Sequence, residues 1–113
     1  MALIQLMKLR NIWIQKEFLL EFKMLNTLEN LIKFARERKS SPVEGSYTNK
    51  LLTDKSLSKA KVLEEVNELI ESVEENSNKI HEAADVFYHL LIFLEANEIK
   101  IEEVMSELEK RKK

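Results

Sequence analysis

Hydrophobic side chains recur along most of this chain at the spacing of a helix. Between residues 26 and 39, and again between residues 57 and 75, leucine, isoleucine, valine and alanine return every three or four positions. Side chains at this spacing share one face of a helix, since about 3.6 residues complete a turn. The same reasoning predicts a short helical segment over residues 47–52 and two further helices over residues 79–96 and 101–110.

Two short segments of turn-forming residues separate the predicted helices. The first, SSPVEGS at residues 40–46, holds the single proline and the single glycine of the chain, and the second is Asn-Ser-Asn at 76–78. A connection as short as the second requires the helices on either side of it to pack antiparallel. So few turn-forming residues could not connect many strands, and the composition therefore predicts an all-α fold, built as an antiparallel helical bundle.

The first 23 residues carry hydrophobic side chains on every side of a helical wheel, with no clear core-facing stripe. Charged residues at positions 8, 10, 16 and 17 interrupt the apolar run too early for a signal or membrane segment. Two interpretations stay open: a helical extension of the native chain, or a stretch upstream of a true start at Met24. We expect an extension over 1–23, one helical domain over 24–113, and a soluble cytoplasmic protein.

Charge and cysteine content narrow the function. A formal net charge of −2 provides no broad electropositive surface for neutralising phosphates, so we expect no nucleic-acid partner. Because the chain has no cysteine, carboxylates and the two histidines are the side chains available to bind a metal ion. Carboxylate oxygens favour magnesium, manganese or calcium.

Acidic side chains border the apolar face of the helix predicted over residues 57–75. Glu65 lies at the edge of that face, Glu68 lies beside it one turn later, and Glu64 points further toward solvent. The apolar face itself comprises Val62, Leu63, Val66, Leu69, Ile70 and Val73. The edge position of Glu65 and Glu68 predicts that they lie where a neighbouring helix packs.

The helix predicted over residues 79–96 is apolar on every side except one narrow stripe. Glu82, Asp85 and His89 form that stripe at spacings of three and four residues. Such a helix is expected to be buried, with its stripe facing a polar cavity or a partner. A buried carboxylate must shift its pKa, pair with a cation or bind a metal ion.

Antiparallel packing of these two helices predicts that four carboxylates converge, those of Glu65, Glu68, Glu82 and Asp85. A divalent cation would remove their mutual repulsion, and all-oxygen ligation suits Mg²⁺, which in turn implies a phosphorylated substrate. Non-functional interpretations compete with this one. The glutamates of the first helix could form a solvated face paired with lysines, the second pair could form a salt bridge with Lys61, and His89 could be a hydrogen-bonded core histidine.

Three separated segments carry recognisable motifs: EGSYTNKLL (44–52), KVLEEVNELI (61–70) and HEAADVFYHLLIFLEANEIKIEEVMSELEKR (81–111). In this order they resemble the phosphoribosyl-ATP pyrophosphatases of histidine biosynthesis, from about Asn26 to the C-terminus. E-E-x-x-E followed by E-x-x-D also resembles the wider MazG-like group of all-α nucleoside triphosphate pyrophosphohydrolases. GSYTxKL and EAADxxYHLL narrow the resemblance to the histidine-pathway branch.

The resemblance implies Mg²⁺-dependent hydrolysis of phosphoribosyl-ATP to phosphoribosyl-AMP and pyrophosphate by a homodimeric MazG-like helical bundle, with a phosphoribosyl-AMP cyclohydrolase as a possible partner. It implies that the four converging carboxylates hold the metal, with Glu64 as an auxiliary carboxylate. Lys50 and Lys61 are candidates for phosphate contacts. The remaining substrate-binding candidates are Ser46, Tyr47, Thr48 and His89.

Two departures from the family pattern are visible. Leu63 stands where many members have glycine, and Lys100 stands where a capping serine or aspartate is expected before the last helix. Neither removes a predicted ligand. Two other functions stay open: a MazG-like pyrophosphohydrolase acting on a free or damaged nucleotide such as dCTP or dUTP, and a non-enzymatic helical dimerisation module.

Overall fold

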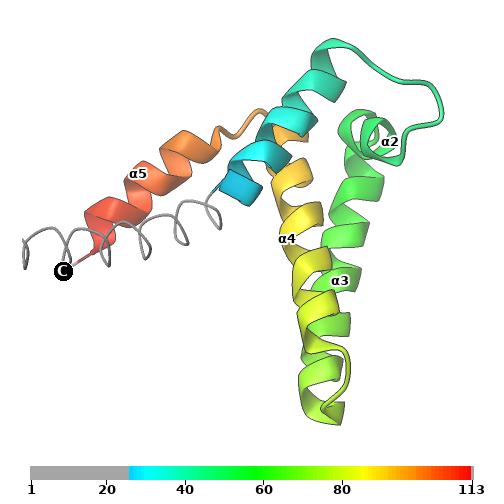
Figure 1. The fold of residues 1–113 in the computed structure, drawn as a ribbon, viewed down its shortest axis with the longest axis vertical. Helices are drawn as coiled ribbons and strands as arrows, with labels where there is room; N and C mark the ends of the chain where they lie inside the picture. The colour runs from blue at the N-terminus through cyan, green and yellow to red at the C-terminus, as the bar shows by residue number, and fades with distance from the viewer. Residues whose placement is uncertain (1–25, 113) are drawn as a thin grey trace, which may run out of the picture. The chain divides into compact units, whose positions relative to one another are not determined.

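The computed structural model describes residues 26–112, and the predicted extension over 1–23 lies outside them. Residues 26–40 are helical, and four further helices follow: α2 (Tyr47–Thr53), α3 (Lys55–Glu75), α4 (Lys79–Ala96) and α5 (Ile101–Arg111) (Figure 1). Strands are absent from the described part of the chain, which confirms the all-α prediction. None of the described helices is long and apolar enough to cross a membrane.

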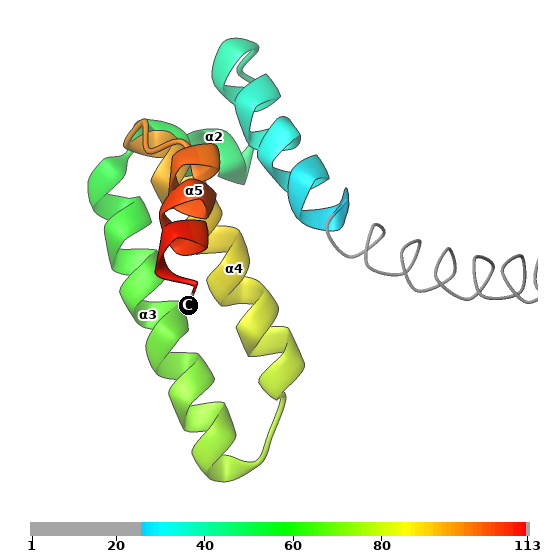
Figure 2. The same cartoon turned by 90° about the vertical axis from the view of Figure 1, so that its left-hand side faces the viewer.

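Helices α3 and α4 form an antiparallel hairpin, as the short connection predicted (Figure 2). Asn76 ends α3 in the left-handed region at φ 54°, which an asparagine tolerates better than most residues. The amide of Ser77 then donates to the Ser72 carbonyl at 2.9 Å. This closed turn reverses the chain and lays α4 along α3.

The short helix α2 follows the predicted loop, and capping residues fix both of its ends. Ser46 accepts a hydrogen bond from the Asn49 amide at 3.3 Å, and Asp54 accepts one from the Leu57 amide at 3.0 Å to begin α3. Gly45 precedes the first cap at φ +80°, a conformation that few other residues adopt without strain. Local sequence therefore sets where α2 begins and where it ends.

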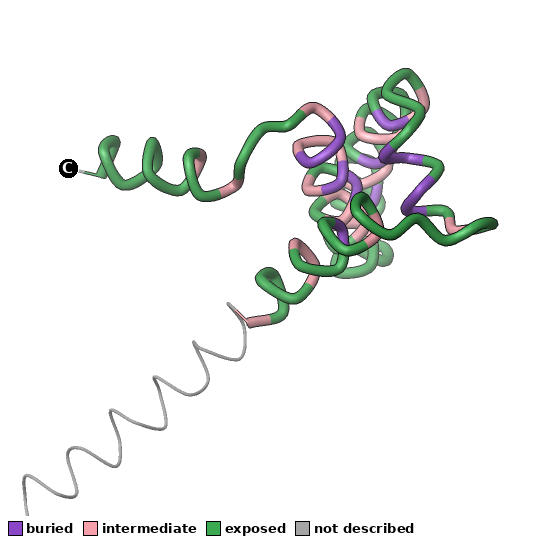
Figure 3. The backbone as a smooth tube through the Cα atoms, turned by 90° about the horizontal axis from the view of Figure 1, so that it is seen from above, coloured by how far each residue is buried: buried purple, intermediate pink, exposed green. Residues whose placement is uncertain are grey.

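The hydrophobic core of the described residues is small and is formed by the helix at 26–40, by α2 and by the second half of α4. Figure 3 colours the buried positions of the described chain purple. Partly buried Leu57 and Tyr88 pack against it. Its buried members are Ala35, Leu51, Leu52, Ile92 and Ala96. A core of this size leaves much of the apolar surface of the two long helices uncovered.

The expectation that α4 is buried on nearly every side is wrong for the part of the chain that the structure describes. Ile80 is 89% exposed and Phe87 is 59% exposed. On α3, Leu63 and Val73 of the predicted apolar face are each 59% exposed, whereas the buried residues of this helix are Ser58, Glu65 and Ser72. The buried residues of α3 therefore lie on its polar flank, and most of its apolar face is left exposed by the described residues.

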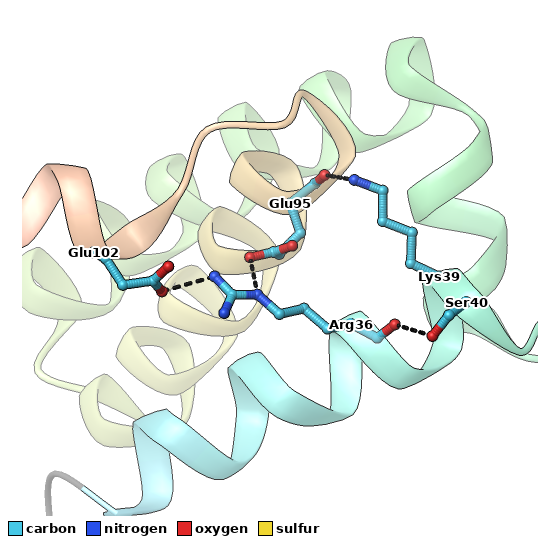
Figure 4. A network of polar contacts seen from close by, with 5 residues as sticks. All are labelled: Arg36, Lys39, Ser40, Glu95 and Glu102. Carbon is cyan, nitrogen blue, oxygen red and sulfur yellow. Dashed lines mark hydrogen bonds and ion pairs between the residues drawn. The ribbon is translucent and has the colours of Figure 1, made fainter.

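Helix α5 has no buried residue, and polar contacts link its start to the rest of the fold (Figure 4). The Arg36 guanidinium donates to Glu102 at 2.7 Å and to Glu95 at 3.1 Å, and Lys39 Nζ donates to the Glu95 carbonyl at 2.8 Å. Lys100 precedes α5 without a side-chain capping bond, as its residue type predicted.

Candidate metal centre and substrate site

Three carboxylates from the two long helices lie together. One oxygen from each of Glu65, Glu68 and Glu82 falls within 4.8 Å of the other two. Glu65 and Glu68 lie about one turn apart on α3, and the antiparallel hairpin brings Glu82 of α4 beside them. The structure therefore joins residues that lie far apart in the sequence into one acidic cluster.

Asp85 belongs to a second group that overlaps the first. Its carboxylate lies within 4.8 Å of ligand atoms from His81 and Glu82, and the His81 Nε2 to Asp85 Oδ2 distance is 3.4 Å. Glu82 is shared by the two groups. The predicted single group of four carboxylates is thus two overlapping triads, and His81, which was not among the predicted site residues, completes the second.

The acidic cluster is electrostatically unfavourable without a cation. Glu65 is 6% exposed, and Glu65 Oε2 and Glu82 Oε2 are shielded from solvent without a hydrogen-bond partner. Burial raises the pKa of both carboxyls, and the neighbouring Glu68 carboxylate raises each pKa further. The negative charge of Asp85 acts in the same direction on both.

Lys61 forms an ion pair with one member of the cluster and none with the others. Its ammonium lies 3.0 Å from Glu64 and 3.7 Å from Glu65, so the alternative in which it pairs with the Glu82 and Asp85 carboxylates is wrong. Glu64 fits the solvated-face interpretation, because it is exposed and paired, but buried Glu65 does not.

The arrangement fits a hard divalent cation. Carboxylates from two helices converge, and two of their shielded oxygens accept no hydrogen bond. A bound cation would give these oxygens a partner. The imidazole of exposed His81 lies at the edge of the cluster and offers one nitrogen ligand. A hard cation accepts a nitrogen ligand but prefers oxygen. The chemistry available here is charge neutralisation and polarisation of a phosphate group.

His89 is buried, and both of its ring nitrogens have partners. Nδ1 donates to the Asp85 carbonyl at 2.8 Å, which leaves Nε2 to accept from the Tyr47 hydroxyl at 3.0 Å in the neutral ring. This geometry matches the core-histidine alternative. Contact with a substrate would require one of these bonds to break, and the substrate-binding role of His89 stays a prediction.

The predicted substrate loop divides into inward and outward side chains. Thr48 is buried and shares a hydrogen bond with the Tyr88 hydroxyl, and the Ser46 hydroxyl is used as a helix cap. Tyr47 and Lys50 are exposed and border a pocket of about 470 Å³. Sequence reasoning missed Asn49, whose side chain bonds to both sides of this loop.

Comparison with known proteins adds an independent finding. A family model described as Phosphoribosyl-ATP pyrophosphohydrolase matches residues 26–112. The phosphoribosyl-ATP pyrophosphatase of Listeria welshimeri is 44% identical over 91 residues, which cover 78% of this chain and 84% of that protein. The phosphoribosyl-ATP pyrophosphatase of Clostridium acetobutylicum is 40% identical over 93 residues, which cover 79% and 81%.

A longer relative also matches. The histidine biosynthesis bifunctional protein HisIE of Pyrococcus furiosus is 41% identical over 90 residues, which cover 79% of this chain and 43% of that protein. The chain thus spans less than half the length of this bifunctional relative. All of the acidic cluster lies inside the region that the family model matches.

Proposed function

Because this chain belongs to the phosphoribosyl-ATP pyrophosphohydrolase family, we propose that it hydrolyses phosphoribosyl-ATP to phosphoribosyl-AMP and pyrophosphate, the second step of histidine biosynthesis. The observation that carries the proposal is the convergence of Glu65, Glu68 and Glu82 within the matched region. An acidic cluster that repels itself is suited to hold a cation against a phosphate chain.

In this proposal Mg²⁺ binds to Glu65, Glu68, Glu82 and Asp85, with Glu64 assisting from the solvent side. Support comes from the all-oxygen character of these ligands and from the two shielded oxygens without donors. When bound, Mg²⁺ supplies neutralisation and polarisation of the phosphate oxygens.

The chain's own groups complete the reaction. One carboxylate of the cluster accepts the proton of the attacking water, whose oxygen bonds to phosphorus as the bond between the α and β phosphates breaks. Pyrophosphate then leaves. Lys50 and Lys61 each contact a phosphate group of the substrate as a cation, which for Lys61 means exchanging part of its ion pair with Glu64.

We also propose a homodimer, formed through the exposed apolar faces of α3 and α4. Leu63, Val73, Ile80 and Phe87 expose more than half of their surface, while the core formed by the described residues contains few large side chains. Exposed apolar area of this kind marks an association surface. Sedimentation equilibrium should give twice the chain mass, and a monomer at assay concentration would contradict this part of the proposal.

A phosphoribosyl-AMP cyclohydrolase is the proposed partner, because it would use the product of this reaction. Support comes from the bifunctional relative, in which the matched region occupies 43% of a longer histidine-biosynthesis protein. A cytoplasmic location is part of the same proposal.

The direct test is pyrophosphate release from phosphoribosyl-ATP, with and without Mg²⁺, by the wild type and Asp85→Asn. We expect the variant to lose at least about 100-fold in kcat/KM, equivalent to about 2.7 kcal/mol, because it removes a negatively charged ligand. Glu71→Gln is the matched control, since Glu71 is an exposed carboxylate on α3 outside both triads. Circular dichroism should show that both variants remain folded.

The same assay separates the alternatives. Preference for dCTP or dUTP over phosphoribosyl-ATP would favour the nucleotide pyrophosphohydrolase interpretation. Hydrolysis of none of these substrates would favour the dimerisation module. Full activity of Asp85→Asn would remove that residue from the proposed site.

A further inference from the structure

The pocket beside the substrate loop has an apolar wall and one cation. Pro42, Val43 and the ring of Tyr47 form its apolar part, and Lys50 reaches it from α2. Val43 is 43% exposed and Tyr47 is 45% exposed, so the described residues leave a large part of each side chain accessible. Glu44 at the same pocket provides a carboxylate acceptor.

Hydrogen bonds order the loop that lines the pocket. Asn49 accepts from the Val43 amide at 2.8 Å and donates to the Arg38 carbonyl at 2.7 Å, which ties the loop to the preceding helix. The Ser46 amide donates to the Val43 carbonyl at 3.1 Å. A loop already ordered by its own hydrogen bonds loses less conformational freedom when a ligand binds.

Tyr47 links this pocket to the acidic cluster. Tyr47 lines the pocket, and its hydroxyl forms a hydrogen bond with His89 Nε2. His89 Nδ1 in turn donates to the backbone carbonyl of Asp85. The charges of Lys61 and Glu65 both act on the Tyr47 hydroxyl, which places it near the cluster. A ligand that spans the two sites would therefore cross the Tyr47 ring.

We propose that this pocket binds the end of the substrate remote from the triphosphate, with the purine base against Tyr47 and Val43 and the 5′-phosphate of the added ribose on Lys50. The proposal rests on the proposed function, because it assumes that the triphosphate lies at the acidic cluster. An aromatic ring and a branched aliphatic side chain suit the flat base. Glu44 accepts a hydrogen bond from a ribose hydroxyl.

This assignment makes Lys50 a specificity residue. ATP carries a triphosphate and a base but lacks the second ribose and its phosphate, so it would leave Lys50 without an anionic partner. A single charge-assisted hydrogen bond to phosphate is consistent with about tenfold in affinity. The pocket would thus distinguish phosphoribosylated nucleotides from ordinary ones.

The test compares the binding of phosphoribosyl-AMP and AMP by calorimetry in EDTA, using the full chain and three variants. Lys50→Met should reduce the preference for phosphoribosyl-AMP by about tenfold, whereas Lys50→Arg should retain most of it. Lys55→Met is the matched control, because Lys55 is an exposed lysine at the start of α3 outside the pocket. It should bind both nucleotides as the wild type does.

Binding and hydrolysis report on different claims. An unchanged preference in Lys50→Met, or no preference in the wild type, would overturn the pocket assignment even if the wild type hydrolyses phosphoribosyl-ATP. Conversely, a wild type that prefers phosphoribosyl-AMP through Lys50 but releases no pyrophosphate would support the pocket and contradict the proposed reaction.

Discussion

Two groups of carboxylates in this chain have opposite surroundings. Glu95 and Glu102 share the Arg36 guanidinium, at 3.1 Å and 2.7 Å. Glu65 and Glu82 lie with other acidic residues, and each has a shielded oxygen without a donor. The first group joins three segments of the fold, whereas the second brings like charges together across the helical hairpin.

The pKa shifts differ in sign between the two groups. Hydrogen bonding to Arg36 lowers the pKa of Glu102, while burial and the Glu68 carboxylate raise the pKa of Glu65. A group satisfied by its own arginine contributes to the fold as it stands. A group raised by burial and repulsion is stabilised by something added, and this is the physical difference between a structural and a candidate functional cluster.

The largest effect on stability is expected from Arg36→Met. The substitution leaves the Glu95 carboxylate, only 11% exposed, without its cation and releases Glu102 of α5. We expect the free energy of unfolding to fall by about 2 kcal/mol, as measured by urea denaturation. Arg111→Met is the matched control, because its ion pair with Glu107 is exposed, and it should cost at most about 0.5 kcal/mol.

Equal losses in these two variants would show that the Arg36 network is no more than a surface ion pair. The carboxylates paired with Arg36 would then contribute no more to the fold than an exposed ion pair does. Loss of pyrophosphatase activity in Arg36→Met at a temperature where it is fully folded would show that the Arg36 network contributes to activity as well as to the fold.

The second effect is stabilisation by Mg²⁺. At ten times its dissociation constant, a cation bound only by the folded state should add about 1.4 kcal/mol. For a domain of this size the melting temperature should then rise by roughly 6 to 11 °C. Glu68→Gln should lose most of this increment, whereas Arg36→Met should retain it. A melting temperature that does not change with Mg²⁺ in the wild type would contradict the metal centre.

The smallest effect is a pair of opposite pH dependences in EDTA. Because the folded pKa of Glu65 is raised above 4.5, its favourable contribution is present below that pH and is lost as pH rises through the folded pKa. Because the folded pKa of Glu102 is lowered, its contribution is present above pH 4.5 and is lost as pH falls through the folded pKa.

Urea denaturation across this pH range would measure both, using wild type, Glu65→Gln and Glu102→Gln. The stability of wild type relative to Glu65→Gln should fall with rising pH, and its stability relative to Glu102→Gln should rise. Slopes of the same sign would contradict the distinction between the two groups.

Local signals in the sequence were sufficient for the helices and most of their ends. The range 79–96 matches α4, and Asn76 ends α3 where the turn-forming residues stand. Helix α3 begins two residues before the predicted Leu57, because the side chain of Asp54 caps it. Hydrophobic periodicity alone does not locate such a cap.

Contacts between distant segments were harder to predict. Antiparallel packing was enough to predict that the glutamates of α3 face Glu82. The division into two triads, one of them with His81, depends on side-chain geometry that the sequence does not give. Arg36 joins residues more than fifty positions away, and no spacing rule identifies such a partner. The exposed faces of α3 and α4 escaped prediction because periodicity locates an apolar face without saying whether the same molecule covers it.

The position of the small core has a consequence for motion. Its buried members cluster at one end of the α3–α4 hairpin, while the turn at 76–78 and exposed Ile80 lie at the other. Among the described residues, core packing therefore holds the two helices together at one end of the hairpin only. Local unfolding at the other end would leave the core intact. Such opening would separate Glu68 from Glu82 and let a bound cation leave. Cation binding would oppose the opening, so it should slow amide hydrogen exchange first near the turn at 76–78.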